Sequence, residues 1–119
     1  MAVLTYIHAA REPEPVARRQ LLEACFAAEG RIVTRGGEIR GREAVARMLE
    51  RVHADPQFER IRVTSAIDAQ GTTYRLRSVI ERRDGTSLEF FDAGEIDASG
   101  KISLVLAFAG ELADADEQG

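Results

Sequence analysis

Residues 87–109 form the stretch that most constrains the fold of this chain. Two runs rich in apolar residues, 87–97 and 102–109, are separated by the turn sequence Ala98-Ser99-Gly100-Lys101. This pattern predicts two long antiparallel strands joined by a hairpin turn. The second run is apolar at both odd and even positions, as in a strand that is covered on both faces. We therefore expect a homodimer through the outer face of the sheet, with the protein's own loops as the alternative cover.

The first half of the chain is predicted to be mainly helical. Apolar residues recur at helical spacing in three segments, and we expect helices at residues 2–10, 15–29 and 42–53. The first helix is expected to bury Val3, Leu4 and Ile7. Glu14 and Pro15 suit the start of the second helix, and Gly30 suits its end. The second helix is expected to bury Leu21, Leu22, Cys25 and Phe26, with Arg18 away from this stripe.

The second half of the chain is predicted to be a meander of strands. A β-branched run places one early strand at residues 31–35, between the second and third helices, and alternating runs place the four strands of the meander at residues 58–68, 72–83, 87–97 and 102–109. Glycines at 36–37, 71, 85 and 100 mark the turns between them. Helices and strands do not alternate along the chain, so the sequence predicts an α+β fold with a mostly antiparallel sheet. We expect a single domain at residues 1–112 and an acidic, flexible tail at residues 113–119.

Composition excludes several classes of function. The net charge is −4, and acidic residues interleave with the arginines, so no nucleic-acid partner is expected. No run approaches the roughly 18 apolar residues of a membrane span, and the first residues lack the features of a signal peptide. One cysteine among 119 residues permits no internal disulfide, which favours the cytoplasm. The histidines and the cysteine are widely spaced, and no phosphate-binding loop is present, so neither a metal nor a cofactor is expected.

Several motifs together resemble the SnoaL-like proteins of the nuclear transport factor two-like superfamily. They are residues 12–22 (EPEPVARRQLL), residues 39–45 (IRGREAV) and the segment from Asp92 to Phe108 with its Gly-Lys-Ile turn. The resemblance covers residues 9–110 and implies three N-terminal helices packed in a strongly curved sheet, a cone-shaped α+β barrel with an apolar pocket. It also implies pairing of subunits through the convex face. It does not specify one function, because this fold hosts isomerases, cyclases, dehydratases, epoxide hydrolases and binding modules.

Asp92 is the candidate catalytic residue. Strand alternation places it on the same face as Leu88, Phe90 and Ile96, where a charge is costly unless it is paired or its pKa rises. A carboxyl group with a raised pKa can act as an acid or a base near neutral pH. The resemblance implies a functional Asp at this position in isomerases and cyclases. The alternatives are a bulge that reverses the face, or an ion pair with Arg75 or Arg77.

Other parts of the family's catalytic sites are missing from the sequence. The second carboxylate of isomerase-like members would fall at Thr34, and their aromatic residue after the first helix would fall at Arg11. Only Tyr6 or Tyr74 could supply a phenol. The expected pocket walls are Tyr74, Phe90, Phe108, Leu22, Phe26, Leu76 and, less directly, His8. We therefore predict a protein that binds a small organic ligand, with proton transfer by Asp92 as its possible chemistry and a non-catalytic binding or interaction module as the alternative.

Overall fold

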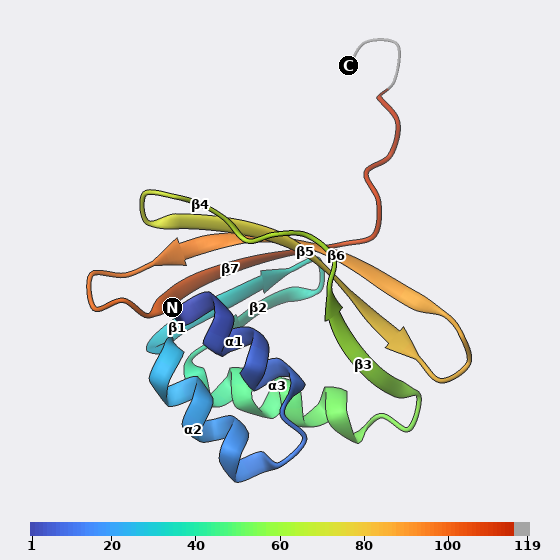
Figure 1. Ribbon diagram of the computed structural model, residues 1–119, viewed down its shortest axis with the longest axis horizontal. Coiled ribbons are helices and arrows are strands. Elements are labelled where there is room, and N and C mark those ends of the chain that lie inside the picture. The colour runs from blue at the N-terminus through green and yellow to red at the C-terminus, as the bar shows by residue number, and fades with distance from the viewer. Residues whose placement is uncertain (116–119) are drawn as a thin grey trace.

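A strongly curved sheet wraps around helices that pack on its concave face, as the computed structural model of the chain shows (Figure 1). The structure describes residues 1–115; residues 116–119, the end of the predicted flexible tail, lie outside the described part. The described part contains helices α1 (Ala2–Arg11), α2 (Pro15–Cys25) and α3 (Arg42–Ala54). Its strands are β1 (Phe26–Thr34), β2 (Gly37–Arg40), β3 (Phe58–Val63), β4 (Asp68–Gln70), β5 (Thr73–Arg82), β6 (Ser87–Ile96) and β7 (Ile102–Ala109).

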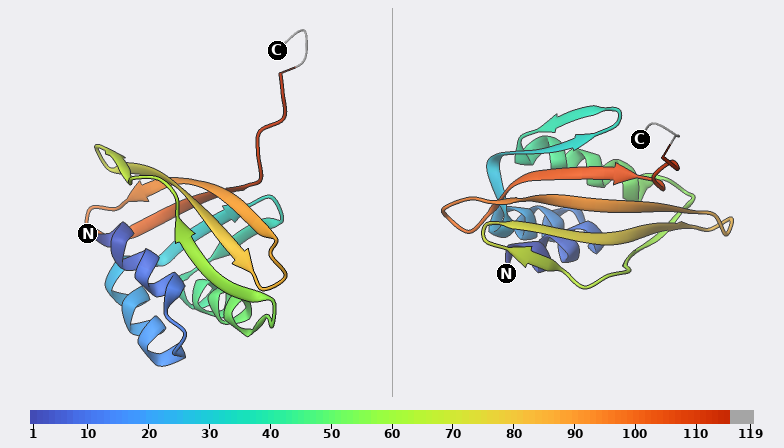
Figure 2. Two further views of the ribbon diagram at one scale, coloured as in Figure 1. Left: turned by 45° about the vertical axis from the view of Figure 1, so that its right-hand side comes forward. Right: turned by 90° about the horizontal axis from the view of Figure 1, so that it is seen from above.

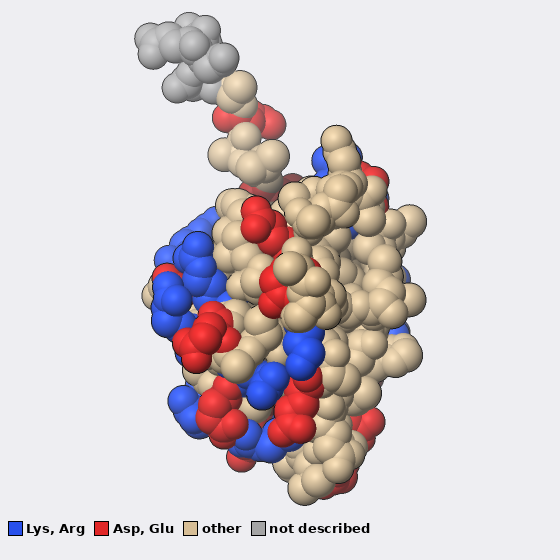
Figure 3. All heavy atoms as spheres, turned by 90° about the vertical axis from the view of Figure 1, so that its left-hand side faces the viewer, with Lys and Arg blue, Asp and Glu red and all other residues tan. Residues whose placement is uncertain are grey.

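The strands of residues 1–115 follow the order β2-β1-β7-β6-β5-β3, and β4 pairs with β5 at one edge. Strands β1 and β7 run parallel, and the other described pairs run antiparallel. The predicted α+β class, with helices in a curved and mostly antiparallel sheet, is confirmed. On the surface seen in Figure 3, positive and negative side chains interleave. Within residues 1–115, no helix is long and apolar enough to cross a membrane.

The buried stripe of α1 differs from the predicted one. Val3, Ile7 and Ala10 are buried, whereas Leu4 is 49 % exposed. The spacing of the buried residues is i, i+4 and i+7, which describes one face of a helix better than Val3-Leu4-Ile7 does. This correction also brings Tyr6, three residues after Val3, onto the face that packs against the core.

The start of α2 agrees with the sequence prediction, but the prediction for Arg18 was wrong. The Glu14 carboxylate caps the helix by accepting hydrogen bonds from the amides of Val16 and Ala17. Arg18 was expected to lie off the buried stripe, yet it is only 2 % exposed. Its guanidinium donates to the carbonyl oxygens of Glu12 (2.9 Å) and Pro13 (3.0 Å). The buried charge therefore satisfies backbone acceptors in the loop between α1 and α2.

The end of α2 comes earlier than predicted. The helix ends at Cys25, and residues 26–29 begin strand β1 instead of continuing the helix to residue 29. Phe26 pairs with Ile102 of β7, and the register then shifts before Arg31. Gly30 lies at this irregularity, where a Cβ would come within 2.6 Å of the Phe26 ring. Gly30 thus allows the chain to pack closely against Phe26, and it is not a helix stop.

Two strand predictions also needed correction. Residues 37–40 form β2, which pairs with β1, so the Gly36-Gly37 turn closes a hairpin that was not predicted. The predicted strand at residues 58–68 is divided into β3 and β4. At the division, the Ser65 hydroxyl accepts a hydrogen bond from the amide of Arg77 at 2.8 Å. This side-chain bond replaces a backbone ladder bond and lets the chain pass from one short strand to the next.

The meander β5-β6-β7 has the register that the sequence predicted for its faces. Leu76, Asp92 and Ala107 lie side by side on the concave face, and Arg77, Phe91 and Phe108 form the neighbouring row on the convex face. Ile102 is the exception. Strand alternation alone would place it with Leu104, Leu106 and Phe108, but a register shift between Glu95 and Ile96 places it in the core, fully buried.

Gly94 is a point of close approach within this meander. It pairs with Tyr74 on one side and Val105 on the other. A Cβ at this position would overlap the carbonyl oxygen of Leu104 and come within 2.7 Å of the Tyr74 hydroxyl. Only a glycine leaves room for the Tyr74 ring to lie across β6.

Replacement of Gly94 by alanine is expected to destabilise the fold. Because backbone as well as side chain must move, Gly94→Ala should lower the free energy of unfolding by about 1–3 kcal/mol, measured by urea denaturation. The matched control is Gly36→Ala, where the nearest atom is the Thr34 hydroxyl at an ordinary 3.7 Å. Equal stability of both variants would show that the close approach at Gly94 does not matter.

Candidate ligand-binding site

A cavity of about 270 Å³ lies inside the cone, between the helices and the concave face of the sheet. Its walls come from α1 and α3 and from strands β1, β3, β5, β6 and β7. The lining is almost entirely apolar. Its polar side chains, within residues 1–115, are Tyr6, Thr34, Tyr74, Ser78 and Asp92. Such a space, apolar with a few converging polar groups, has the character of a small-molecule site.

Asp92 is the ionisable carboxyl group in this wall. It lies in the middle of β6, between Leu76 of β5 and Ala107 of β7, and the unbroken register of β5 and β6 keeps it on the concave face. Its Oδ1 atom is buried and has no hydrogen-bond partner within residues 1–115. Burial away from water raises the pKa of Asp92 to about 6. The group can therefore exist in both protonation states near neutral pH.

The predicted partners of Asp92 lie elsewhere. Arg75 and Arg77 occupy positions opposite Ala93 and Phe91, on the convex face of the sheet. The guanidinium of Arg75 binds Asp68 instead, at 2.7 Å. The ion-pair alternative with either arginine was therefore wrong, and so was the alternative of a bulge at Asp92.

Two phenols share the cavity with Asp92. Tyr6 reaches it from α1, with its ring packed against Phe26 at a centroid distance of 5.8 Å. Tyr74 reaches it from β5, and its hydroxyl donates to the carbonyl oxygen of Leu104 at 3.3 Å. Burial raises the pKa of both phenols, and the Asp92 charge raises it further. Both therefore remain protonated and can donate hydrogen bonds.

Thr34 lines the cavity at the position where isomerase-like members would carry a second carboxylate. Its hydroxyl donates to the carbonyl oxygen of Gly37 at 3.0 Å and accepts from the amide of Gly36 at 3.2 Å. The side chain is thus occupied by the β1–β2 turn. Thr34 supplies no base to the cavity.

The remaining predicted pocket residues divide into two groups. Tyr74, Leu76 and Phe90 line the cavity as expected. Four others do not: Leu22, Phe26, Phe108 and His8. Leu22 and Phe26 are fully buried in the core, Phe108 points outward from β7 and is 58 % exposed, and His8 is exposed on α1. His8 follows the buried Ile7, and one residue turns a helix by about a quarter of a revolution, away from the core.

Sequence reasoning missed the contribution of α3 and much of that of α1. Met48, Leu49 and Val52 form one wall of the cavity, whereas the sequence predicted only a helix at these positions. Tyr6 was considered only as a phenol donor. The spacing of Val3, Tyr6, Ile7 and Ala10 at i, i+3, i+4 and i+7 was the signal that could have placed it.

No metal site is evident in the part of the chain that the structure describes: no three His, Cys, Asp or Glu side chains lie close enough to hold an ion there. Cys25 is fully buried. Burial raises the pKa of its thiol to about 11, so it is not a reactive thiolate.

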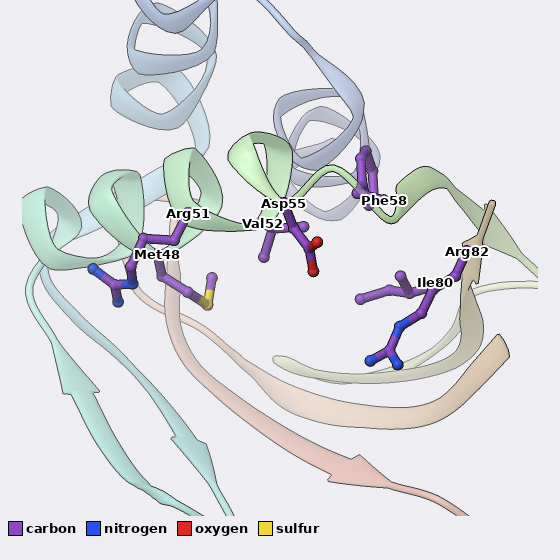
Figure 4. A pocket seen from close by; sticks show the side chains of 7 residues that line it. All are labelled: Met48, Arg51, Val52, Asp55, Phe58, Ile80 and Arg82. Carbon is purple, nitrogen blue, oxygen red and sulfur yellow. The ribbon is translucent and has the colours of Figure 1, made fainter. Parts of the chain in front are cut away.

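A second pocket, of about 290 Å³, adjoins the cavity. We call it the vestibule (Figure 4). Met48, Val52 and Ile80 line both spaces, so the vestibule and the cavity share a wall. The other residues of the vestibule are Arg51, Asp55, Phe58 and Arg82.

Helices packed in a curved sheet around an apolar cavity define the fold of the SnoaL-like and nuclear transport factor two-like proteins. Comparison with solved structures shows that this chain has the same fold. The chain is similar to a proposed isomerase of the SnoaL-like family from Agrobacterium tumefaciens, with a TM-score of 0.81 and 23% identity over 92% of this chain and 95% of that one.

Two further solved structures support the same fold. One is an NTF2-like protein from Exiguobacterium, with a TM-score of 0.71 and 18% identity over 94% of this chain and 100% of that one. The other is an epoxide hydrolase of the LEH-like kind from Mycobacterium tuberculosis, with a TM-score of 0.69 and 18% identity over 92% of this chain and 80% of that one. No family model matches the sequence, and the search of curated proteins found no match.

The raised pKa of Asp92 predicts a specific pH dependence. In a carbon-13 NMR titration, the Asp92 carboxyl should titrate near pH 6, whereas hydrogen bonding from Ser99 holds the pKa of Asp97 below its usual value. Because the folded pKa of Asp92 lies above that of an unfolded Asp, ionisation of Asp92 costs stability as pH rises from 4 to 6. Asp92→Asn should therefore gain about 2–3 kcal/mol relative to the wild type between pH 4 and pH 8. Titration of Asp92 near pH 4 would contradict this reading.

Proposed function

We propose that the protein is a cytoplasmic, cofactor-free binding protein for a small and largely apolar organic molecule, and that Asp92 exchanges a proton with that molecule. The single observation that carries the proposal is the buried Oδ1 atom of Asp92, which lies in an apolar cavity without a hydrogen-bond partner in residues 1–115. A buried acceptor without a partner costs about 1–3 kcal/mol. A ligand that donates a hydrogen bond to it would offset this cost.

The arrangement of groups supports proton transfer to or from carbon or oxygen. As a carboxylate, Asp92 can remove a proton from a bound ligand, and the raised pKa makes it a stronger base than an ordinary Asp. The phenol of Tyr6 lines the cavity and stays protonated because burial raises its pKa, so it can donate to a ligand oxygen that gains negative charge. The proton would be returned from Asp92 to the ligand, so the reaction needs no redox partner.

A non-catalytic binding module is the second candidate. It is favoured by one observation: apart from Asp92, the residues of 1–115 that line the cavity carry no charge. Thr34 does not replace the missing second carboxylate. In this alternative the cavity holds a ligand, and Asp92 only orients it.

Deuterium exchange of a simple ketone separates the two candidates. With cyclohexanone in heavy water, the wild type should accelerate exchange of the protons beside the carbonyl, with half of the maximal rate near pH 6 as Asp92 ionises. Asp92→Asn should lower this rate by about 100-fold or more, because general-base catalysis contributes about that much. Tyr6→Phe should lower it less. If Asp92→Asn exchanges the ketone as fast as the wild type, catalysis by Asp92 is refuted and only the binding module remains.

We further propose a homodimer through the convex face of the sheet. Leu104, Leu106 and Phe108 of β7 lie on this face beside Ala93 and Phe91 of β6. Phe108 and Phe91 are 58 % and 39 % exposed, although both are large and apolar. Figure 2 (right) looks onto this face, and none of the described helices crosses it. An exposed apolar patch of this kind is typical of an interaction surface, which supports a second subunit as its cover.

The dimer can be tested with a matched pair of variants. The wild type should have the mass of a dimer in light scattering at micromolar concentration. Phe108→Glu should give a monomer, because two charges would be buried at the interface. Leu4→Glu, at a residue of α1 that is 49 % exposed, should remain dimeric. A monomeric wild type would refute the proposed interface.

A further inference from the structure

The vestibule differs in charge from the cavity that it adjoins. The Asp55 carboxylate, at the residue that follows α3, and the Arg82 guanidinium, at the end of β5, point into the opening, and Arg51 lies beyond Met48 (Figure 4). None of the ion pairs formed within residues 1–115 includes Arg51, Asp55 or Arg82. Asp55 accepts a hydrogen bond from the amide of Gln57 at 2.9 Å. The vestibule thus carries two guanidinium groups and one carboxylate, an excess of one positive charge.

The cavity, in contrast to the vestibule, disfavours a negatively charged group on a ligand. Its ionisable lining group is Asp92, whose Oδ1 atom already lacks a hydrogen-bond partner in residues 1–115. An anionic group placed beside Asp92 would lose its hydration and meet a like charge, and both effects are costly where water is excluded. A negative group on a ligand is therefore restricted to the vestibule, and the part that enters the cavity must be neutral.

Size points to a ligand that occupies both spaces. The cavity alone, at about 270 Å³, falls just below the roughly 300–1,000 Å³ of common small-molecule sites. The vestibule adds a space of similar volume along the wall formed by Met48, Val52 and Ile80. These three apolar side chains line both spaces, so a ligand that spans the two would pack against them throughout.

We propose that the ligand is an amphipathic carboxylic acid that binds with its apolar chain in the cavity and its carboxylate in the vestibule. Arg82 is the main carboxylate-binding residue, because its guanidinium points into the opening and can donate two parallel hydrogen bonds. Arg51 adds attraction at longer range, and Asp55 opposes binding. This assignment rests on the proposed ligand-binding function, and it names the substrate class for that function.

Three probes with the same chain and different head groups test the assignment: octanoate, octanol and octyltrimethylammonium, each titrated calorimetrically into the full chain. Hexanoate and decanoate cover other chain lengths. Octanoate should bind about fivefold or more tightly than octanol at low salt, and this advantage should shrink at high ionic strength. Octyltrimethylammonium should bind weakest.

Variants assign the effect to individual residues. Arg82→Gln should weaken octanoate about three- to tenfold and leave octanol unchanged, as expected for loss of a partly exposed charged hydrogen bond. Asp55→Asn should strengthen octanoate. The control is Arg83→Gln, which changes the same charge at the next residue of the chain, outside the residues that line the vestibule. Circular dichroism confirms that each variant is folded.

The outcomes separate this inference from the function on which it rests. If octanol binds as tightly as octanoate, or if Arg82→Gln and Arg83→Gln are indistinguishable, the carboxylate assignment is wrong although the cavity binds apolar molecules. Tighter binding of octyltrimethylammonium would reverse the assignment in favour of Asp55 and a cationic head group. If none of the probes binds at any chain length, the proposed binding function fails, and the inference fails with it.

Discussion

The site depends on the uninterrupted pairing of β5 with β6. Nine consecutive residue pairs, from Thr73 with Glu95 to Glu81 with Ser87, keep one register without a bulge. Side chains on a strand alternate between faces, so this register alone decides that Asp92 faces the cavity while Phe91 and Ala93 face outward. A slip of one residue would exchange the two sets. It would place Asp92 in water and two apolar side chains where the helices pack.

The same register accounts for both predicted surfaces of the protein. On the concave side it joins Leu76, Asp92 and Ala107 into one row of the cavity wall, and on the convex side it joins Arg77, Phe91 and Phe108. The irregularities of the sheet in the described residues lie at three other pairings: between Phe26 and Arg31 of β1, between Phe58 and Arg60 of β3, and between Glu95 and Ile96 against β7. They bend the ends of the strands around the helices and leave the central rows regular. The sheet can therefore curve while the Asp92 side chain keeps its direction toward the cavity.

The sequence was a good guide wherever strand alternation or helix periodicity was strong. It predicted the α+β class, the β5-β6-β7 meander and the inward direction of Asp92 without any knowledge of contacts. It failed where a distant partner decided the local structure. Residues 26–29 have helix-forming alanines, yet pairing of Phe26 with Ile102 makes them a strand. Arg18 is charged and was expected at the surface, but the carbonyl oxygens of Glu12 and Pro13 draw it into the interior.

The cavity was harder to predict than the fold, because its walls are shared by elements far apart in sequence. Alternation along β5 and β6 gave Tyr74, Leu76 and Phe90 correctly, since each strand's pattern contains its own face. No pattern within a single element shows how α1 and α3 pack on the sheet. That packing places Tyr6 and Met48 in the cavity wall with Asp92, and it buries Leu22 and Phe26 in the core.

If the proposed binding function holds, the division of charge between the cavity and the vestibule decides which ligands fit. The cavity holds a carboxyl group that is more easily ionised in the unfolded chain than in the folded one, so the fold bears a cost to keep it there. That cost falls when a neutral donor reaches Oδ1, and it grows when an anion does. The vestibule, with Arg51 and Arg82 against Asp55, has the reverse preference. A ligand of the proposed class therefore places its carboxylate in the vestibule and its neutral chain in the cavity, and a neutral hydrogen-bond donor on that chain would lower the cost at Oδ1.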